Sequence, residues 1–377
     1  MAFYQQHYYK LNEKIMRFFG FWPEQDSVSA LIRRSYMLTY FWAALIMQIK
    51  YLAKKCDNFD SLMNVIPELV MNVAVTISFM CLFPKRKNYN GIYEIMCYDW
   101  TTKHTEEEIK IKELYAKKGK NISIAGFAYS VCIVIPLGVA EILFQMFKKT
   151  LPDYYIILNF NPKYQFLNGV FWSMFMFLLG MCIASNTLML MVNLFHVFGM
   201  VDVIGHRLGN LNVRKCKSLG EKDHYESVKN DILFCIEKHS LVIKFISRVE
   251  RHYKPCILVC LIVAVLVLSL TMVQTLKFDK LHIKSLVTTT GELCFLAAIC
   301  FVTQSLIDSF DQMSTQIYNT EWYTFPVRIQ KLVCFMLHRA NTPCFMTENA
   351  FFALSNQKFG EVMKTAISFY MVFRTFQ

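Results

Sequence analysis

The sequence NQKFGEVMKTAISFYMVFRTFQ at 356–377 closes the chain and is about as long as a helix that crosses a membrane. Lys364, Ser368 and Arg374 interrupt its apolar residues. Polar groups of this kind need partners or water, so the segment is poorly suited to a helix surrounded only by lipid. We therefore expect a pore-lining helix, held in place by six earlier spans.

The composition of the whole chain indicates an all-α polytopic membrane protein. Of its 377 residues, 55% are hydrophobic and 15% are aromatic, and the mean hydropathy is +0.31. Several apolar runs reach the roughly 20 residues that cross a bilayer. A net charge of +12 fits basic cytoplasmic loops in such a protein, so we expect membrane lipids and no nucleic acid as partners.

Seven segments are predicted to span the membrane. They lie at about 35–52, 62–83, 122–147, 166–200, 256–276, 286–307 and 356–377. The segment 84–120 is polar and is expected to be a loop. Apolar residues at helical spacing predict amphipathic helices around 232–246 and 327–337.

The distribution of Lys and Arg predicts the orientation. One side of the membrane would carry 28 of these residues and the other 10, which places the N-terminus in the cytoplasm and the C-terminus outside. The sequon Asn121-Ile122-Ser123 would then be cytoplasmic and unglycosylated. The expected units are a cytoplasmic N-terminal segment, spans one to four, a cytoplasmic helical extension, spans five and six, a cytoplasmic anchor segment and the pore-lining helix, at 1–34, 35–200, 201–254, 255–307, 308–350 and 351–377.

The sequence predicts neither a metal site nor a cofactor. The 13 cysteines form no CxxC pair. His252, Cys256 and Cys260 share a helix face, but their ends are about 12 Å apart along the axis, too far to hold one zinc ion. No HExxH, GxSxG or phosphate-binding loop is present, so a multipass membrane enzyme is a distant alternative.

Several short motifs stand out: Gly-Phe-Trp-Pro at 20–23, Ile317-Tyr318, Trp322-Tyr323 followed by Pro326, the run LHRANTP at 337–343, and Ser-Phe-Tyr at 368–370. Together they resemble the motifs of the insect odorant receptors. The resemblance covers the whole chain as architecture and the part from Ile317 onward as motif.

The resemblance implies a ligand-gated, non-selective channel for monovalent and divalent cations, in the plasma membrane of a sensory neuron dendrite. It implies a heterotetramer with the shared odorant co-receptor, whose anchor would be formed by 201–254 and 308–345. The chain looks like the odorant-binding subunit, because it lacks the co-receptor's extended loop between the fourth and fifth spans. A small volatile odorant would be its ligand.

The resemblance also suggests site residues. In the last helix, Val372 and Phe376 match a hydrophobic outer gate, with Thr375 beside them. The odorant pocket is expected in the outer half of the bundle. On the third span, Ile135, Gly138 and Ile142 match the family's ligand-facing positions. Further candidates, chosen for apolar or aromatic character, are Val70, Val73, Phe171, Trp172, Phe175, Met176, Leu179 and Leu268.

Three carboxylates, Glu68, Glu141 and Glu292, lie within apolar spans. Each could accept a hydrogen bond from a ligand or attract cations, although neighbouring hydroxyl groups or lysines could also satisfy it. Their role stays open at this point.

Two receptor classes are alternatives. A G-protein-coupled receptor has the opposite orientation, and the Asp-Arg-Tyr and Asn-Pro-x-x-Tyr motifs are absent. A gustatory receptor would share the fold and gating. Its last helix would read Thr-Tyr, five apolar residues and Gln-Phe, whereas this chain has Ser-Phe-Tyr, which favours the odorant class.

Overall fold

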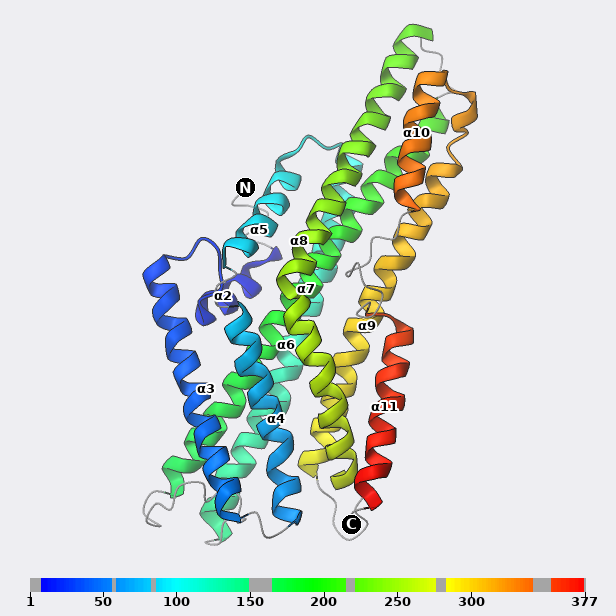
Figure 1. Cartoon of the computed structure of the whole chain (residues 1–377). Helices are drawn as coiled ribbons and strands as arrows, with labels where there is room; N and C mark the ends of the chain where they lie inside the picture. The colour runs from blue at the N-terminus through cyan, green and yellow to red at the C-terminus, as the bar shows by residue number, and fades with distance from the viewer. Residues whose placement is uncertain are drawn as a thin grey trace.

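Long helices running roughly side by side build the molecule (Figure 1). The structure is a computed structural model and describes residues 8–55, 59–82, 86–148, 165–214, 221–275, 283–341 and 354–375. The elements are α2 (Lys10–Phe19), α3 (Ser27–Lys55), α4 (Phe59–Leu82), α5 (Arg86–Thr101), α6 (Glu106–Lys148), α7 (Gln165–Arg214), α8 (Glu221–Thr275), α9 (Ile283–Tyr318), the 3-10 turn η4 (Trp322–Thr324), α10 (Val327–Ala340) and α11 (Asn356–Thr375).

The all-α prediction is confirmed, and each of the seven expected spans coincides with a helix. The expected spans correspond to α3, α4, α6, α7, α8, α9 and α11. Four of these, α4, α7, α8 and α9, contain described segments long and apolar enough to cross a membrane by length and composition. The α11 helix is more polar because Lys358, Glu361, Lys364 and Arg374 lie along it.

The segment 84–120 was expected to be a loop, and this prediction was wrong. It contains α5 and the first turns of α6. Tyr89, Ile92 and Met96 recur at helical spacing in α5 and are buried, each at most 2% exposed. Their spacing gives α5 an apolar side that packs on α8.

The two predicted amphipathic segments are both helical, but the first is continuous with the fifth span. The segment 232–246 and the fifth span form the single helix α8, which continues through Pro255. The segment 327–337 is part of α10, where Ile329, Val333 and Met336 face the core. Figure 1 shows α7, α8, α9 and α10 extending well past the level at which α3 and α4 end.

The Gly-Phe-Trp-Pro motif folds the start of the chain onto the bundle. Gly20 ends α2 with a φ of 81°, and its N–H is bonded to the carbonyls of Arg17 and Met16. An added Cβ there would lie 2.6 Å from the carbonyl oxygen of Ala30. The motif's aromatic rings then pack edge-to-face, Phe21 on Phe79 and Trp22 on Tyr93.

The α6 and α7 helices pack together closely along their length. At Gly126 an added Cβ would lie 2.5 Å from Leu188 Cδ2. A small residue at this position lets the two backbones approach, as is common between membrane helices.

The described chain begins beside the upper ends of α3 and α4 and ends at the lower end of α11 (Figure 1). An odd number of crossings has this consequence, so the arrangement agrees with seven spans.

Candidate functional site

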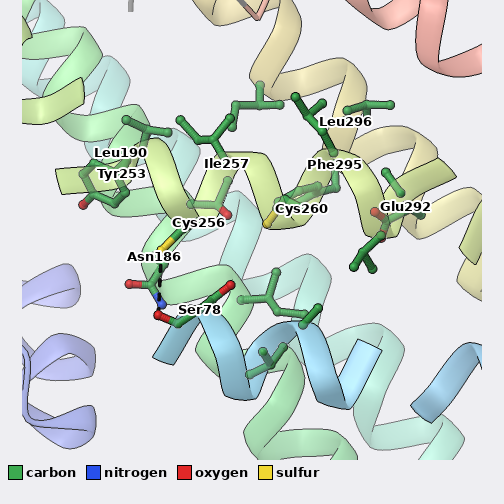
Figure 2. A pocket seen from close by; sticks show the side chains of 18 of the residues that line it. Ser78, Asn186, Leu190, Tyr253, Cys256, Ile257, Cys260, Glu292, Phe295 and Leu296 are labelled. Atoms are coloured by element: carbon green, nitrogen blue, oxygen red, sulfur yellow. Dashed lines mark hydrogen bonds between the residues drawn. The ribbon is translucent and has the colours of Figure 1, made fainter. Parts of the chain in front are cut away.

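A cavity opens where α4, α7, α8 and α9 meet, beside Leu354 at the start of α11. It holds about 960 Å³ of empty space, part of which is open to the surroundings. Figure 2 shows Ser78, Asn186, Cys256 and Cys260 among its lining side chains. A concave, mostly apolar space between helices is a common setting for small-molecule sites.

Apolar side chains supply most of the wall. They include Met71 and Val75 from α4, Leu190 from α7, Leu261 from α8 and Phe295 from α9. These residues recur on the inward face of each helix, so the same periodicity that buries the helices also makes the cavity apolar. A ligand there would gain mainly from leaving water.

A few polar groups interrupt this wall, and some of them are already bonded within the protein. The Cys256 thiol donates to the Ser78 carbonyl over 3.8 Å, the contact drawn in Figure 2. The Asn186 amide donates to the Cys182 carbonyl at 3.0 Å. Local bonds of this kind leave the two groups less available to a ligand.

Glu292 of α9 differs from these groups. Its side chain is partly buried and lines the cavity. Within the described residues, its carboxylate has no hydrogen-bond or ion-pair partner. Figure 2 shows it at one end of the cavity, with Tyr253 and Leu190 at the other end.

The aromatic residues proposed for ligand contact on the fourth span lie elsewhere on α7. Cys182 is the first α7 residue to line the cavity, about two turns beyond Phe175. Trp172 and Phe175 are buried and meet edge-to-face at 5.2 Å between ring centroids. Phe175 packs on Phe41, and Phe171 packs on Tyr40. These rings therefore fill the contact between α3 and α7.

Of the remaining proposed ligand residues, those whose surroundings are described do not line this cavity either. Met176, Leu179, Val70, Val73 and Leu268 lie outside its wall. Leu179 and Leu268 are buried in the core, whereas Val73 and Ile135 are 37% and 48% exposed. Gly138, Glu141 and Ile142 belong to α6, but their surroundings are outside the part that is described. A pocket in the outer half of the bundle stays a prediction.

Residues proposed for the gate lie near the end of α11. Val372 is 49% exposed in the single chain. The Thr375 hydroxyl donates to the Val372 carbonyl at 2.6 Å, and Phe376 lies outside the described residues. Another side of α11 packs on the bundle, because Val362 and Ala366 are buried.

A buried charge cluster joins α5 to α6, α7 and α8. Asp99 is fully buried, and its carboxylate lies 2.8 Å from Lys112 Nζ and also pairs with Lys238. Arg207 donates to both oxygens of Glu108, at 2.7 and 3.1 Å. Buried charges need such partners because desolvation is costly. We call these five residues the Asp99 cluster.

The Asp99 cluster shifts the pKa values of its members. Burial by itself raises the pKa of Asp99, but the charges of His196, Lys112 and Lys238 outweigh it, so the pKa is lowered well below its usual range. Burial likewise acts to raise the pKa of Glu108, while hydrogen bonds from His104 and Arg207 bring it to about 2. Burial lowers the pKa of Lys112 to about 8 despite the neighbouring Asp99. The carboxylates are therefore ionised near neutral pH.

No group of three or more His, Cys, Asp or Glu side chains that could hold a metal ion occurs in the described parts of the chain. Cys256 and Cys260, which share a helix face with His252, both line the cavity. The His252 ring packs against Tyr89 and Tyr253.

The fold and the cavity define an all-α protein of the seven-transmembrane type, and comparison with known proteins gives its family. The profile of the 7tm Odorant receptor family matches residues 58–367. The chain therefore belongs to the 7tm odorant receptor family. Members of this family are receptors and not enzymes.

Solved structures share the fold over nearly the entire chain. The insect olfactory receptor OR5 from Machilis hrabei superposes with a TM-score of 0.81, covering 97% of this chain and 96% of that receptor at 10% identity. Its complex with eugenol gives a TM-score of 0.80 at 9% identity. At this identity the likeness concerns the fold alone.

Curated relatives match over shorter lengths. The odorant receptor coreceptor of Anopheles gambiae is 23% identical over 149 residues, 38% of this chain and 31% of the co-receptor. Odorant receptor 13a of Drosophila melanogaster is 20% identical over 241 residues, 59% of this chain and 57% of that receptor. The match thus spans about a third to somewhat more than half of these relatives.

Proposed function

We propose that the chain is the odorant-binding subunit of an odorant-gated, non-selective cation channel, working with the shared odorant co-receptor in the plasma membrane of a sensory neuron dendrite. The observation that carries the proposal is a mostly apolar cavity inside a fold shared with a receptor that binds eugenol. Small volatile molecules have few polar groups, so a mostly apolar wall suits them.

The cavity is also well placed to affect α11. Leu354, just before that helix, belongs to its wall, and α11 packs on α8 and α9. A ligand that prefers one arrangement of α8 and α9 would shift the equilibrium of α11 by its difference in affinity. In this proposal Val372, Thr375 and Phe376 surround the pore through which monovalent and divalent cations pass.

The role of binding subunit agrees with the short connection between α7 and α8. The α7 helix ends at Arg214 and α8 begins at Glu221, which leaves no room for an extended loop. The projecting parts of α7, α8, α9 and α10 would form the cytoplasmic anchor, within 201–254 and 308–350. Subunits of the tetramer would meet there.

Whole-cell current tests the proposal directly. Expressed with the co-receptor, the chain should give cation current in response to members of a volatile panel, and expressed alone it should give none. Surface labelling in both cases is the control. Full-sized currents from the chain alone would contradict the need for a partner, and silence of the pair across the panel would contradict the channel proposal.

Orientation gives an independent prediction. With the N-terminus in the cytoplasm, Asn121 near the cytoplasmic end of its span should carry no glycan when the chain is expressed in cells. Treatment with a glycosidase should leave the electrophoretic mobility unchanged. As a positive control, a sequon introduced into 276–282, expected outside, should be glycosylated. A glycan on Asn121 would place this end of the span outside the cell and so contradict the predicted orientation.

A further inference from the structure

Among the described residues of the cavity wall, Glu292 is the charged side chain. The described lining includes no Lys, Arg or His that could pair with it. Asn186 and Cys256, two of the polar groups in the wall, are already bonded to backbone carbonyls. The cavity therefore offers a ligand one strong acceptor in an otherwise weakly polar wall.

An ionised carboxylate in such surroundings is costly unless a cation joins it. The Asp99 cluster shows how this chain satisfies a buried carboxylate, with Lys112 and Lys238 both on Asp99. Glu292 has no such cation among the described residues. A ligand that carries its own positive charge would supply it.

The surroundings of Glu292 also suit the rest of an amine. Phe295 lies three residues further along α9 and also lines the cavity, so the two side chains share a helix face. An ammonium group beside the carboxylate would place its hydrocarbon part against Phe295 and Leu296, and an aromatic face also attracts the cation. Figure 2 shows these two residues next to Glu292 along α9.

We propose that this cavity is a receptor site for small, largely apolar primary amines, with Glu292 accepting hydrogen bonds from the ammonium group. The inference names the ligand class for the receptor function proposed above and rests on it. Carboxylic acids are excluded, because a second negative charge beside Glu292 is repelled and finds no cation among the described wall residues. Alcohols of the same skeleton fit the apolar wall but bind more weakly, because they lack the charge.

The test compares primary amines with the alcohols and acids of the same carbon skeleton, for example benzylamine, benzyl alcohol and benzoic acid. Binding is measured as the shift in thermal unfolding midpoint of the purified full-length chain in detergent, and gating as current with the co-receptor. We expect amines to bind more tightly than the matched alcohols. Glu292→Gln should weaken amine binding about 100-fold and leave alcohol binding nearly unchanged.

Two further variants separate a ligand contact from a folding defect. Glu292→Asp keeps the carboxylate and should retain part of the amine preference. Glu68→Gln removes another carboxylate within a predicted span, one that does not line the cavity, and should retain the full preference. The alcohol response serves as the measure that each variant is folded.

The outcomes distinguish this inference from the channel proposal. An amine preference in the thermal shift without any current would support the site and contradict the channel. Equal binding of amines and alcohols, or an amine preference that survives Glu292→Gln, would overturn the inference while leaving the channel intact. A change in ion permeability with no change in amine binding would overturn it as well, assigning Glu292 to conduction.

Discussion

Replacing Asp99 by Asn should lower the free energy of unfolding by about 3–5 kcal/mol, because it leaves two buried lysines without their shared carboxylate. Lys112 and Lys238 both pair with Asp99 and are each 3% exposed. Asparagine preserves the shape but carries no charge. The unfolding midpoint of the purified chain in detergent should fall by several degrees, and cell-surface expression should decrease.

A second substitution that removes one of the unpaired lysine charges is the internal control for this prediction. Adding Lys238→Met to Asp99→Asn removes one of the stranded charges, so the double variant should recover part of the loss. Asp311→Asn on the exposed side of α9 should change stability by less than about 0.5 kcal/mol. A loss at Asp99 no larger than that at Asp311 would mean that the cluster contributes little.

The pH dependence of the Asp99 effect has a definite sign. The folded-state pKa of Asp99 is lowered relative to its ordinary value, so the stabilisation is present above the ordinary value near 4 and is lost as pH falls below it. The difference in stability between the native chain and Asp99→Asn should therefore be full at pH 7 and shrink in acid.

The long helices could be predicted because their apolar runs are far longer than a loop would contain. Every expected span coincides with a helix, and the pattern in 327–337 was sufficient to predict α10 (Val327–Ala340). The helix α5 was missed for a physical reason. Its buried residues, such as Tyr89 and Ile92, are interspersed with polar residues and come shortly after the basic run at 85–87. The high average polarity of the segment therefore obscured the helical spacing of the apolar residues.

The cavity could not be predicted in the same way, because residue type does not reveal which helices separate and which make contact. Trp172 and Phe175 have the chemistry of ligand-binding residues, yet they fill the space against α3. Glu292 did carry a signal, a carboxylate in an apolar span, but nothing in the sequence distinguishes it from Glu68. The pairing of Asp99 with Lys238, 139 positions away, likewise depends on tertiary structure.

Replacing Val372 by Ser should raise the resting current of the channel formed with the co-receptor about tenfold, which corresponds to a shift of ~1.4 kcal/mol between closed and open states. In the proposed channel Val372 contributes to a hydrophobic constriction that excludes water when closed. A hydroxyl at this position holds water and favours conduction. Its exposure in the single chain agrees with a surface that faces a pore or another subunit.

A residue on a different face of α11 provides the matched comparison for Val372. Ile367 is 48% exposed, close to the 49% of Val372, but lies roughly 140° away around the helix. Ile367→Ser removes a similar apolar side chain on a different face and should leave the resting current unchanged. The measurement is the current without odorant, normalised to surface expression and to the maximal odorant response. If the two variants leak equally, the effect comes from loosened packing of α11; if only Val372→Ser leaks, the face that carries Val372 and Thr375 controls conduction.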